Sequence, residues 1–532
     1  MRRADFRKSF VAAYLTVDAR SLALGRVVLA VVLLIDLGRR VPVLRDLYSN
    51  DGVLPNHTVL WRPPWPQLFS LLFSASHVAE AATVFAFAGL CFLCLLVGWR
   101  TRLFQVLSFV MATSLHNRIL FVENSGSIAL GAVLLWTAFL PLGRRFSVDA
   151  LLLGSRERPD VPSPPADPRV VSLAVLGLLA QLSVIYAFNF LHKSGATWRE
   201  GTAVHYMLFQ ERIVTQLGVW VREQAPLAVT KALTYGTLFI EAAAPCLILA
   251  PFLRRWTRLA AIALLVGLHG GIALLANLGI FSAAMFTFLP FLVDGAHWDW
   301  LERKWPLGAR GRLRAASSRI RRLVANAFAS SPRPPAPLAQ RGRRALTYLR
   351  ETGVAFAMLV LAAELSVANA AIPSALRWTN RPAWMVSLVM YPHLFEGWSM
   401  FAPDSPLQDH MVYVDAVTVG GRHVDPLNEV ASRVAALPVD DIPVRLGQSS
   451  FWCDYELQIP NDGDYWQALT EWIVRYPERT GRREDAVASF EVWTLQHDSP
   501  APGQRRATNV QRRRLIQWPP NDPVKCALSD AR

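Results

Sequence analysis

Residues 233–253 read LTYGTLFIEAAAPCLILAPFL, and this apolar run within Leu227–Leu253 decides the class of fold. About 20 apolar residues are enough for a helix to cross the hydrocarbon core of a bilayer. Eight further runs of similar character lie at Leu22–Leu37, Val78–Trp99, Leu103–Leu120, Ser127–Leu142, Val170–Leu191, Leu259–Asn277, Ile280–Val293 and Val354–Ile372. The sequence therefore predicts an α-helical polytopic bundle of about nine transmembrane helices in the cell membrane.

The composition agrees with a membrane protein. Hydrophobic residues make up 52% of the chain and charged residues only 18%, which is less charge than soluble proteins of this size carry. Residues 1–20 lack a long apolar core and a small-residue cleavage site, so we expect the first span to be an uncleaved anchor. The five cysteines have no zinc-site spacing, and we expect no metal.

The net charge of +15 is concentrated in a few loops. Between Leu301 and Arg350 there are thirteen Lys or Arg and one acid, Glu302. If each apolar run crosses once, nearly all basic clusters fall on one side, and basic loops stay in the cytoplasm. This distribution predicts a cytoplasmic N-terminus, contacts with membrane lipids, and no nucleic-acid partner.

The chain divides into four segments. We expect a transmembrane bundle over 1–300, a basic cytoplasmic linker over 301–350, the last transmembrane helix over 351–372, and a small extracytoplasmic α+β domain over 373–532. In the last segment, alternating residues around Gly420–Gly421 predict a hairpin, Tyr465–Tyr476 a helix and Ala488–His497 a strand. Cys453 and Cys526 lie there, in a compartment that permits a disulfide, and the sequence leaves that pairing open.

Ionisable residues gather at the outer ends of several predicted spans. Each of these residues can have a purely structural role. A Lys at the end of a span usually extends its ammonium group to the membrane interface, and a buried His often hydrogen-bonds a neighbour. Their convergence favours a pocket in the outer half of the bundle, lined by spans 3, 5 and 7. Burial disfavours the charged form of an amine, and a neutral amine can act as a general base. The residues concerned are Arg118, Glu123, Asn124, His192, Lys193, Trp198 and His269, with Glu241 at mid-depth in span 6.

The segment Phe395–Pro406, just after the last span, carries the apolar side chains Trp398, Met400 and Phe401. Aromatic residues at this depth anchor well at the interface. We expect the segment either to cover the pocket as a lid or to seat the outer domain on the membrane.

Five motifs together resemble the vitamin K-dependent gamma-carboxylase superfamily, in particular the bacterial horizontally transferred transmembrane (HTTM) domain proteins. They cover most of residues 20–295 and a piece around 395–430. The motifs are SLALGRVVLAVVLLIDLGRR (21–40), NSGSIALGAVLLWTAFLPLGRRFSVDALL (124–152), LHKSGATWREG (191–201), HGGIALLANLGIFS (269–282) and FEGWSMFAPDSP (395–406).

The resemblance implies a function. Lys193 takes the position of the family's catalytic base, and His269 would orient the oxygen of reduced vitamin K or another quinone. The activity implied is quinone-coupled carboxylation of an extracytoplasmic protein or peptide, with Arg118, Glu123, Asn124, His192, Trp198, Trp398 and Met400 around the quinone. The chain departs from the family where ENSGS lacks a His and where WSMFAPDS lacks an Asp and a His.

A second hypothesis is a non-catalytic membrane scaffold, or a maturation or immunity factor whose outer domain holds a partner. A transporter fits less well, because the sequence has no inverted repeat and no pair of broken spans.

Overall fold

The computed structural model describes residues 3–61, 63, 68–154, 167–304, 306, 319, 340–432, 435, 449–504 and 506–520. Within these residues, six helices are long and apolar enough to cross a membrane. They confirm the prediction of a helical membrane protein. The six are α2 (Ala19–Arg40), α5 (Val78–Val97), α9 (Leu173–His192), α13 (Leu227–Leu249), α14 (Arg254–Leu275) and α18 (Gln340–Ala368).

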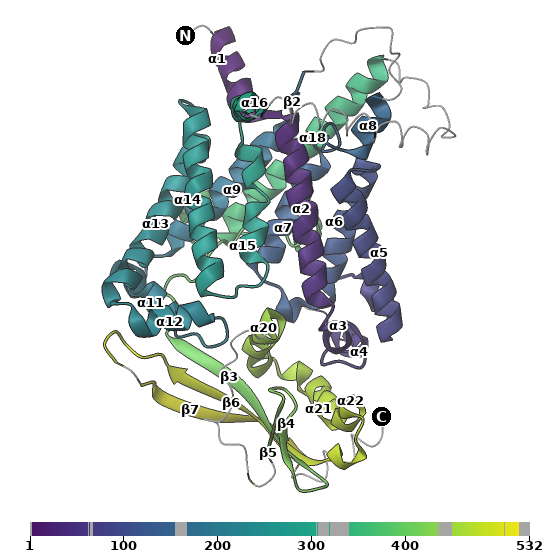
Figure 1. Cartoon of the computed structure of the whole chain (residues 1–532), viewed down its shortest axis with the longest axis vertical. Helices are drawn as coiled ribbons and strands as arrows, with labels where there is room; N and C mark the ends of the chain where they lie inside the picture. Colours follow the sequence, from purple (N-terminus) through teal and green to yellow (C-terminus); the bar gives the residue numbers. More distant parts are fainter. Residues whose placement is uncertain are drawn as a thin grey trace.

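The count of nine spans is not confirmed. The other three predicted runs form α6 (Thr101–Arg118), α7 (Ser125–Ala138) and α15 (Phe281–Phe286), the last followed by a 3-10 turn at Leu289–Leu292. At 1.5 Å per residue, the 14 residues of α7 reach only about 21 Å, less than the core of a bilayer. Most of α7 is buried in the middle of the bundle (Figure 1). A helix surrounded by protein need not match the length of a lipid-facing one.

The two ends of the bundle differ. The end opposite the C-terminal sheet carries α1 (Arg3–Phe10), α8 (Val148–Gly154) and α16 (Gly295–Lys304) (Figure 1). A short two-stranded sheet also lies there, made by β1 (Thr16–Asp18) and β2 (Arg169–Val171). Most of the predicted linker 301–350 lies outside the described residues, and the cytoplasmic orientation of this end stays a prediction.

The C-terminal region forms an antiparallel sheet in the order β5-β4-β3-β6-β7. Gly421, at φ 72°, turns β3 back into β4, as the alternating pattern predicted. The predicted helix and strand appear as α21 and β6. The bounds are β3 (Gln408–Thr418), β4 (His423–Asp425), β5 (Val430–Ser432), α20 (Ser450–Gln458), α21 (Trp466–Val474), α22 (Tyr476–Thr480), β6 (Val487–Asp498) and β7 (Thr508–Trp518).

The C-terminal region packs directly on one end of the bundle (Figure 1). The rings of Phe121 and Tyr465 lie 4.4 Å apart between centroids, and Trp472 Nε1 donates to Asp46 at 3.1 Å. Buried side chains of both parts therefore form one continuous apolar core. Short helices at this junction are α3 (Leu44–Tyr48), α4 (Asn56–Trp61), α10 (Ala196–Arg199), α11 (Ala203–Met207) and α12 (Gln216–Gln224). A further short helix, α19 (Ala383–Met390), packs along α18.

Candidate functional site

A cavity of about 220 Å³ lies between α9, α13 and α14, and we call it the lysine cavity. Its wall is mostly apolar, as is usual for small-molecule sites. Polar side chains interrupt this wall. Lys193 pairs with Glu241 and Tyr186 pairs with His269, and Asn189 and Thr237 also line the cavity. The predicted residues Lys193, His269, Trp198 and Met400 thus line one cavity.

Lys193 caps the C-terminal end of α9 and turns into the bundle. Its Nζ donates to both carboxylate oxygens of Glu241 at 2.7 and 2.8 Å and lies 5.0 Å from the ring centroid of Trp198. Both side chains of the pair are buried, with 3% and 8% exposure. The pair can hold its shared proton on either partner without changing its net charge, so one proton can move within it.

The sequence places Glu241 at mid-depth in its span but does not assign it to the pocket. An ionisable residue in the middle of an apolar span normally faces the bundle interior and pairs there. This rule predicts that Glu241 has a partner in the bundle interior, but it does not identify the partner.

His269 faces the same cavity from the middle of α14. Its Nε2 lies 2.7 Å from the hydroxyl oxygen of Tyr186, and the ring of Phe281 packs edge-on against it. Among the described residues, Nδ1 of His269 has no hydrogen-bond partner although it is buried. Tyr186 was missed by the sequence reasoning, because a tyrosine in an apolar run carries no signal of its own.

One wall of the lysine cavity is thin. Ala232, Leu233 and Gly267 line the cavity and are also exposed on the outer surface of α13 and α14. A Cβ placed on Gly236, Gly267 or Gly271 would meet nothing within 4 Å. The glycines therefore leave room at the side where α13 and α14 would face lipid.

Met400 and Phe401 cover the cavity. The backbone N–H of Met400 donates to Asn189 Oδ1 at 2.9 Å, and Trp198 Nε1 donates to the carbonyl of Phe401 at 2.8 Å. These bonds hold Phe401 at φ 54°, a conformation that non-glycine residues adopt at a cost. Of the two expected arrangements for Phe395–Pro406, contact with the cavity is the one these residues adopt.

Two predicted pocket residues, His192 and Trp398, lie outside the cavity and contact the segment that carries Met400 and Phe401. His192 Nδ1 donates to the carbonyl of Trp398 at 2.8 Å, and Trp398 Nε1 donates to Glu396 at 2.8 Å. Neither His192 nor Trp398 lines the lysine cavity. They fasten the covering segment to the end of α9.

Asn124 lines a second cavity of about 230 Å³, which we call the asparagine chamber. The two cavities share Leu278, Phe281, Met400 and Phe401 on their walls. Asp454 of α20 enters the chamber and accepts a hydrogen bond from Asn124 Nδ2 at 3.3 Å. The C-terminal region thus brings a carboxyl group next to the ENSGS loop, and nothing in the local sequence indicated this.

Asp454 should make stability depend on pH. Burial, with help from Glu123, raises its pKa to about 7 although Arg39 and Arg212 favour the ionised form. The folded state then holds a proton that the unfolded chain, with an Asp pKa near 3.9, releases. We expect stability to fall as pH rises from about 4 through about 7.

Chemical denaturation in detergent at several pH values would measure this slope. Asp454→Asn should flatten it, and Asp464→Asn, at an exposed position of the same region, should leave it as in the wild type. An unchanged slope in Asp454→Asn would contradict the assignment.

Glu123 and Arg118 do not line the lysine cavity, so the predicted pocket is wrong in this part. Arg40 binds Glu123 at 3.0 Å, Asp36 at 2.9 Å and the hydroxyl of Tyr48 at 2.5 Å. Arg118 is buried with its guanidinium carbon 6.0 Å from the ring centroid of Phe73. Arg118, the last residue of α6, faces Phe73, and Glu123, in the loop before α7, faces Arg40 of α2, so α13 and not α6 completes the cavity.

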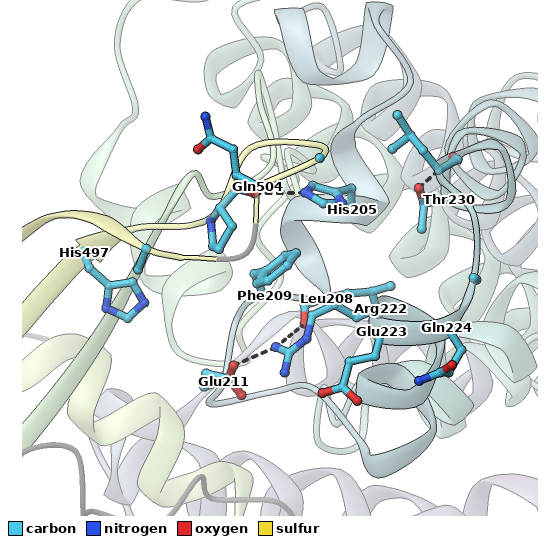
Figure 2. A pocket seen from close by; sticks show the side chains of 15 residues that line it. His205, Leu208, Phe209, Glu211, Arg222, Glu223, Gln224, Thr230, His497 and Gln504 are labelled. Atoms are coloured by element: carbon cyan, nitrogen blue, oxygen red, sulfur yellow. Dashed lines mark hydrogen bonds and ion pairs between the residues drawn. The ribbon is translucent and has the colours of Figure 1, made fainter.

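An outer groove of about 830 Å³ lies between α11, α12 and the loop joining β6 to β7. Figure 2 shows Arg222 on its wall, donating to Glu211 at 2.6 Å and to the carbonyl of Leu208 at 3.2 Å. His205 Nε2 donates to the carbonyl of Pro500 at 2.9 Å and ties the loop to α11. Leu208 lines both this groove and the lysine cavity, so the two are neighbours.

The possible disulfide between Cys453 and Cys526 is not tested. The Sγ of Cys453 donates to the carbonyl of Arg212 at 2.9 Å, whereas Cys526 lies outside the described residues.

A scan against protein-family models finds no match, and searches of curated proteins and of solved structures find none either.

Proposed function

We propose that the protein binds a quinone from the bilayer in the lysine cavity and accepts a proton from its ring hydroxyl through Lys193. The observation that carries this proposal is the presence of two hydrogen-bonded pairs, Lys193–Glu241 and Tyr186–His269, on a mostly apolar wall among membrane-length helices.

The lining fits such a ligand. An apolar wall with a few placed polar groups suits an aromatic ring with a hydrocarbon tail. The buried Nδ1 of His269, which has no partner among the described residues, can bind a ring oxygen. The thin wall at Gly267 and Gly271 gives a tail a way out between α13 and α14. When bound, a reduced quinone supplies two-electron chemistry and a weakly acidic hydroxyl.

Lys193 is the group that takes the proton. With the shared proton on Glu241, the amine of Lys193 is neutral and its Nζ can accept a proton from the hydroxyl. The resulting ammonium of Lys193 would stabilise negative charge on a bound ring oxygen in this mostly apolar site. Met400 and Phe401 exclude water from above.

The reaction class we propose is quinone-coupled carboxylation, as the resemblance to the carboxylase superfamily implies. The asparagine chamber, which shares a wall with the lysine cavity, would receive the acceptor. Asp454 is the carboxyl group that lines that chamber among the described residues, where the family has a His nearby.

A non-catalytic scaffold is the second candidate. One observation favours it. Both carboxylate oxygens of Glu241 accept hydrogen bonds from Lys193 Nζ, so the ion pair can serve only to hold α9 and α13 together.

The thin wall offers a test of ligand binding. Gly271→Leu should fill the cavity and reduce the quinone that co-purifies with the protein, measured by organic extraction and mass spectrometry. Overfilling a packed site costs about 1–3 kcal/mol, or about 5- to 150-fold in affinity. Gly270→Leu is the matched control, because Gly270 neighbours Gly271 on α14, also has free space, and does not line the cavity. Wild-type protein without quinone, or equal retention by both variants, would refute quinone binding.

A further inference from the structure

Among the residues that the structure describes, the strand β7 is a long free edge of the C-terminal sheet. It pairs with β6 on one side and ends the order β5-β4-β3-β6-β7. Every residue from Thr508 to Arg514 is exposed. An edge strand presents unpaired backbone N–H and C=O groups, to which another extended chain can add.

This edge is strongly basic. Residues 499–518 contain five arginines, Arg505, Arg506, Arg512, Arg513 and Arg514, and no acid. Arg514 is held by Glu491 at 2.6 Å, and Arg513 donates to the carbonyl of Pro460 at 2.8 Å. In the part of the chain that the structure describes, no carboxylate lies within ion-pair distance of Arg506 or Arg512. These two guanidinium groups are therefore available at the surface.

The side chains beside the edge are partly apolar. Arg512 pairs in register with Leu495, and Tyr413 pairs with Trp493 in the next row. Leu495, Tyr413, Met411 and Trp493 cluster on this face of the sheet. Because side chains alternate between the two faces of a sheet, the acidic residues of an alternating acidic and apolar peptide would lie beside Arg512, and its apolar residues would lie on the opposite face.

The start of β7 leads to the outer groove. Gln504, just before the strand, lines the groove (Figure 2), and so does Ala507. Leu208 lines both the groove and the lysine cavity. A chain lying along β7 and continuing past Thr508 would pass over this groove. The edge is therefore placed to hold a polypeptide next to the membrane-level site.

We propose that β7 is a docking strand for an acidic, extended segment of another protein on the same side of the membrane as the C-terminal sheet. The segment adds to the sheet beside β7, with its carboxylates toward Arg506 and Arg512. A second copy of this chain is a poorer occupant, because pairing β7 with β7 would bring arginines together across the strands. This inference does not depend on the chemistry at Lys193.

The test uses the full chain in nanodiscs and a fluorescent peptide of alternating Glu and Val. Fluorescence anisotropy should detect binding that weakens as salt is raised. The counterpart peptide of Lys and Val should not bind. Arg506→Glu with Arg512→Glu should weaken binding about tenfold, since each surface charge pair contributes modestly. The control variant Arg482→Glu reverses the charge of an exposed residue in the same region but outside β7. This variant should bind the peptide as the wild type does.

Backbone pairing is tested separately from charge. N-methylation of either the Glu or the Val residues blocks the amides on one edge of an extended peptide. Strand addition predicts that only one of these two peptides loses binding. If both bind normally, or if the Arg506→Glu/Arg512→Glu protein binds as the wild type does, the docking strand is refuted. A concentration-dependent dimer that excludes the peptide would assign the edge to a second copy and also overturn the proposal.

Discussion

Replacing Lys193 with methionine should lower the free energy of unfolding by about 3–5 kcal/mol, because it leaves the buried carboxylate of Glu241 without its partner. Glu241→Met should lower the free energy of unfolding by a similar amount, because the buried ammonium group of Lys193 then has lost its partner. The double variant Lys193→Met/Glu241→Met removes both charges and should recover most of the loss, because apolar side chains of similar size can replace a buried ion pair.

Thermal or denaturant unfolding in detergent would measure all three variants. The control is Arg222→Met, which breaks the more exposed pair with Glu211 and should cost no more than about 1 kcal/mol. Additive losses in the double variant would show that Lys193 and Glu241 do not interact in the folded protein, and would remove the pair from the site.

Lys193→Arg should abolish catalysis while keeping the fold. A guanidinium still binds Glu241, so stability should stay within about 1–3 kcal/mol of the wild type, the range for one overpacked side chain. It remains protonated at any ordinary pH and cannot accept a proton. The reaction that the family resemblance implies consumes oxygen as the oxidant of the reduced quinone. Oxygen uptake by protein in nanodiscs, supplied with a reduced 2-methyl-1,4-naphthoquinone, should therefore fall by about 10²-fold or more.

Lys231→Arg on α13 is the matched control, since Lys231 does not line the cavity, and it should keep the wild-type rate. The scaffold hypothesis expects no protein-dependent oxygen uptake from any of these proteins. A Lys193→Arg protein as active as the wild type would exclude Lys193 as the base, although it would leave quinone binding and the β7 docking strand untouched.

The sequence by itself determined that this is a helical membrane protein. The run at Leu227–Leu253 is long and apolar enough to span a bilayer whatever surrounds it, and five other runs share this property. The hairpin at Gly420–Gly421 was also determined locally, by alternation around a turn. Length, apolarity and turn chemistry act within one segment, so they can be read from it.

Only the tertiary structure decided how the polar residues pair. Lys193 and His269 were expected to share a pocket and they do, yet Glu241 and Tyr186 complete it in place of Glu123 and Arg118. The pattern of a helix gives the direction of a side chain only relative to its own axis, and packing against neighbours sets the rotation of that axis. Packing also explains why α7 is short, because a helix enclosed by protein does not have to match the thickness of the bilayer. Packing also places Asp454 of α20 beside Asn124, which is more than three hundred residues away in the sequence.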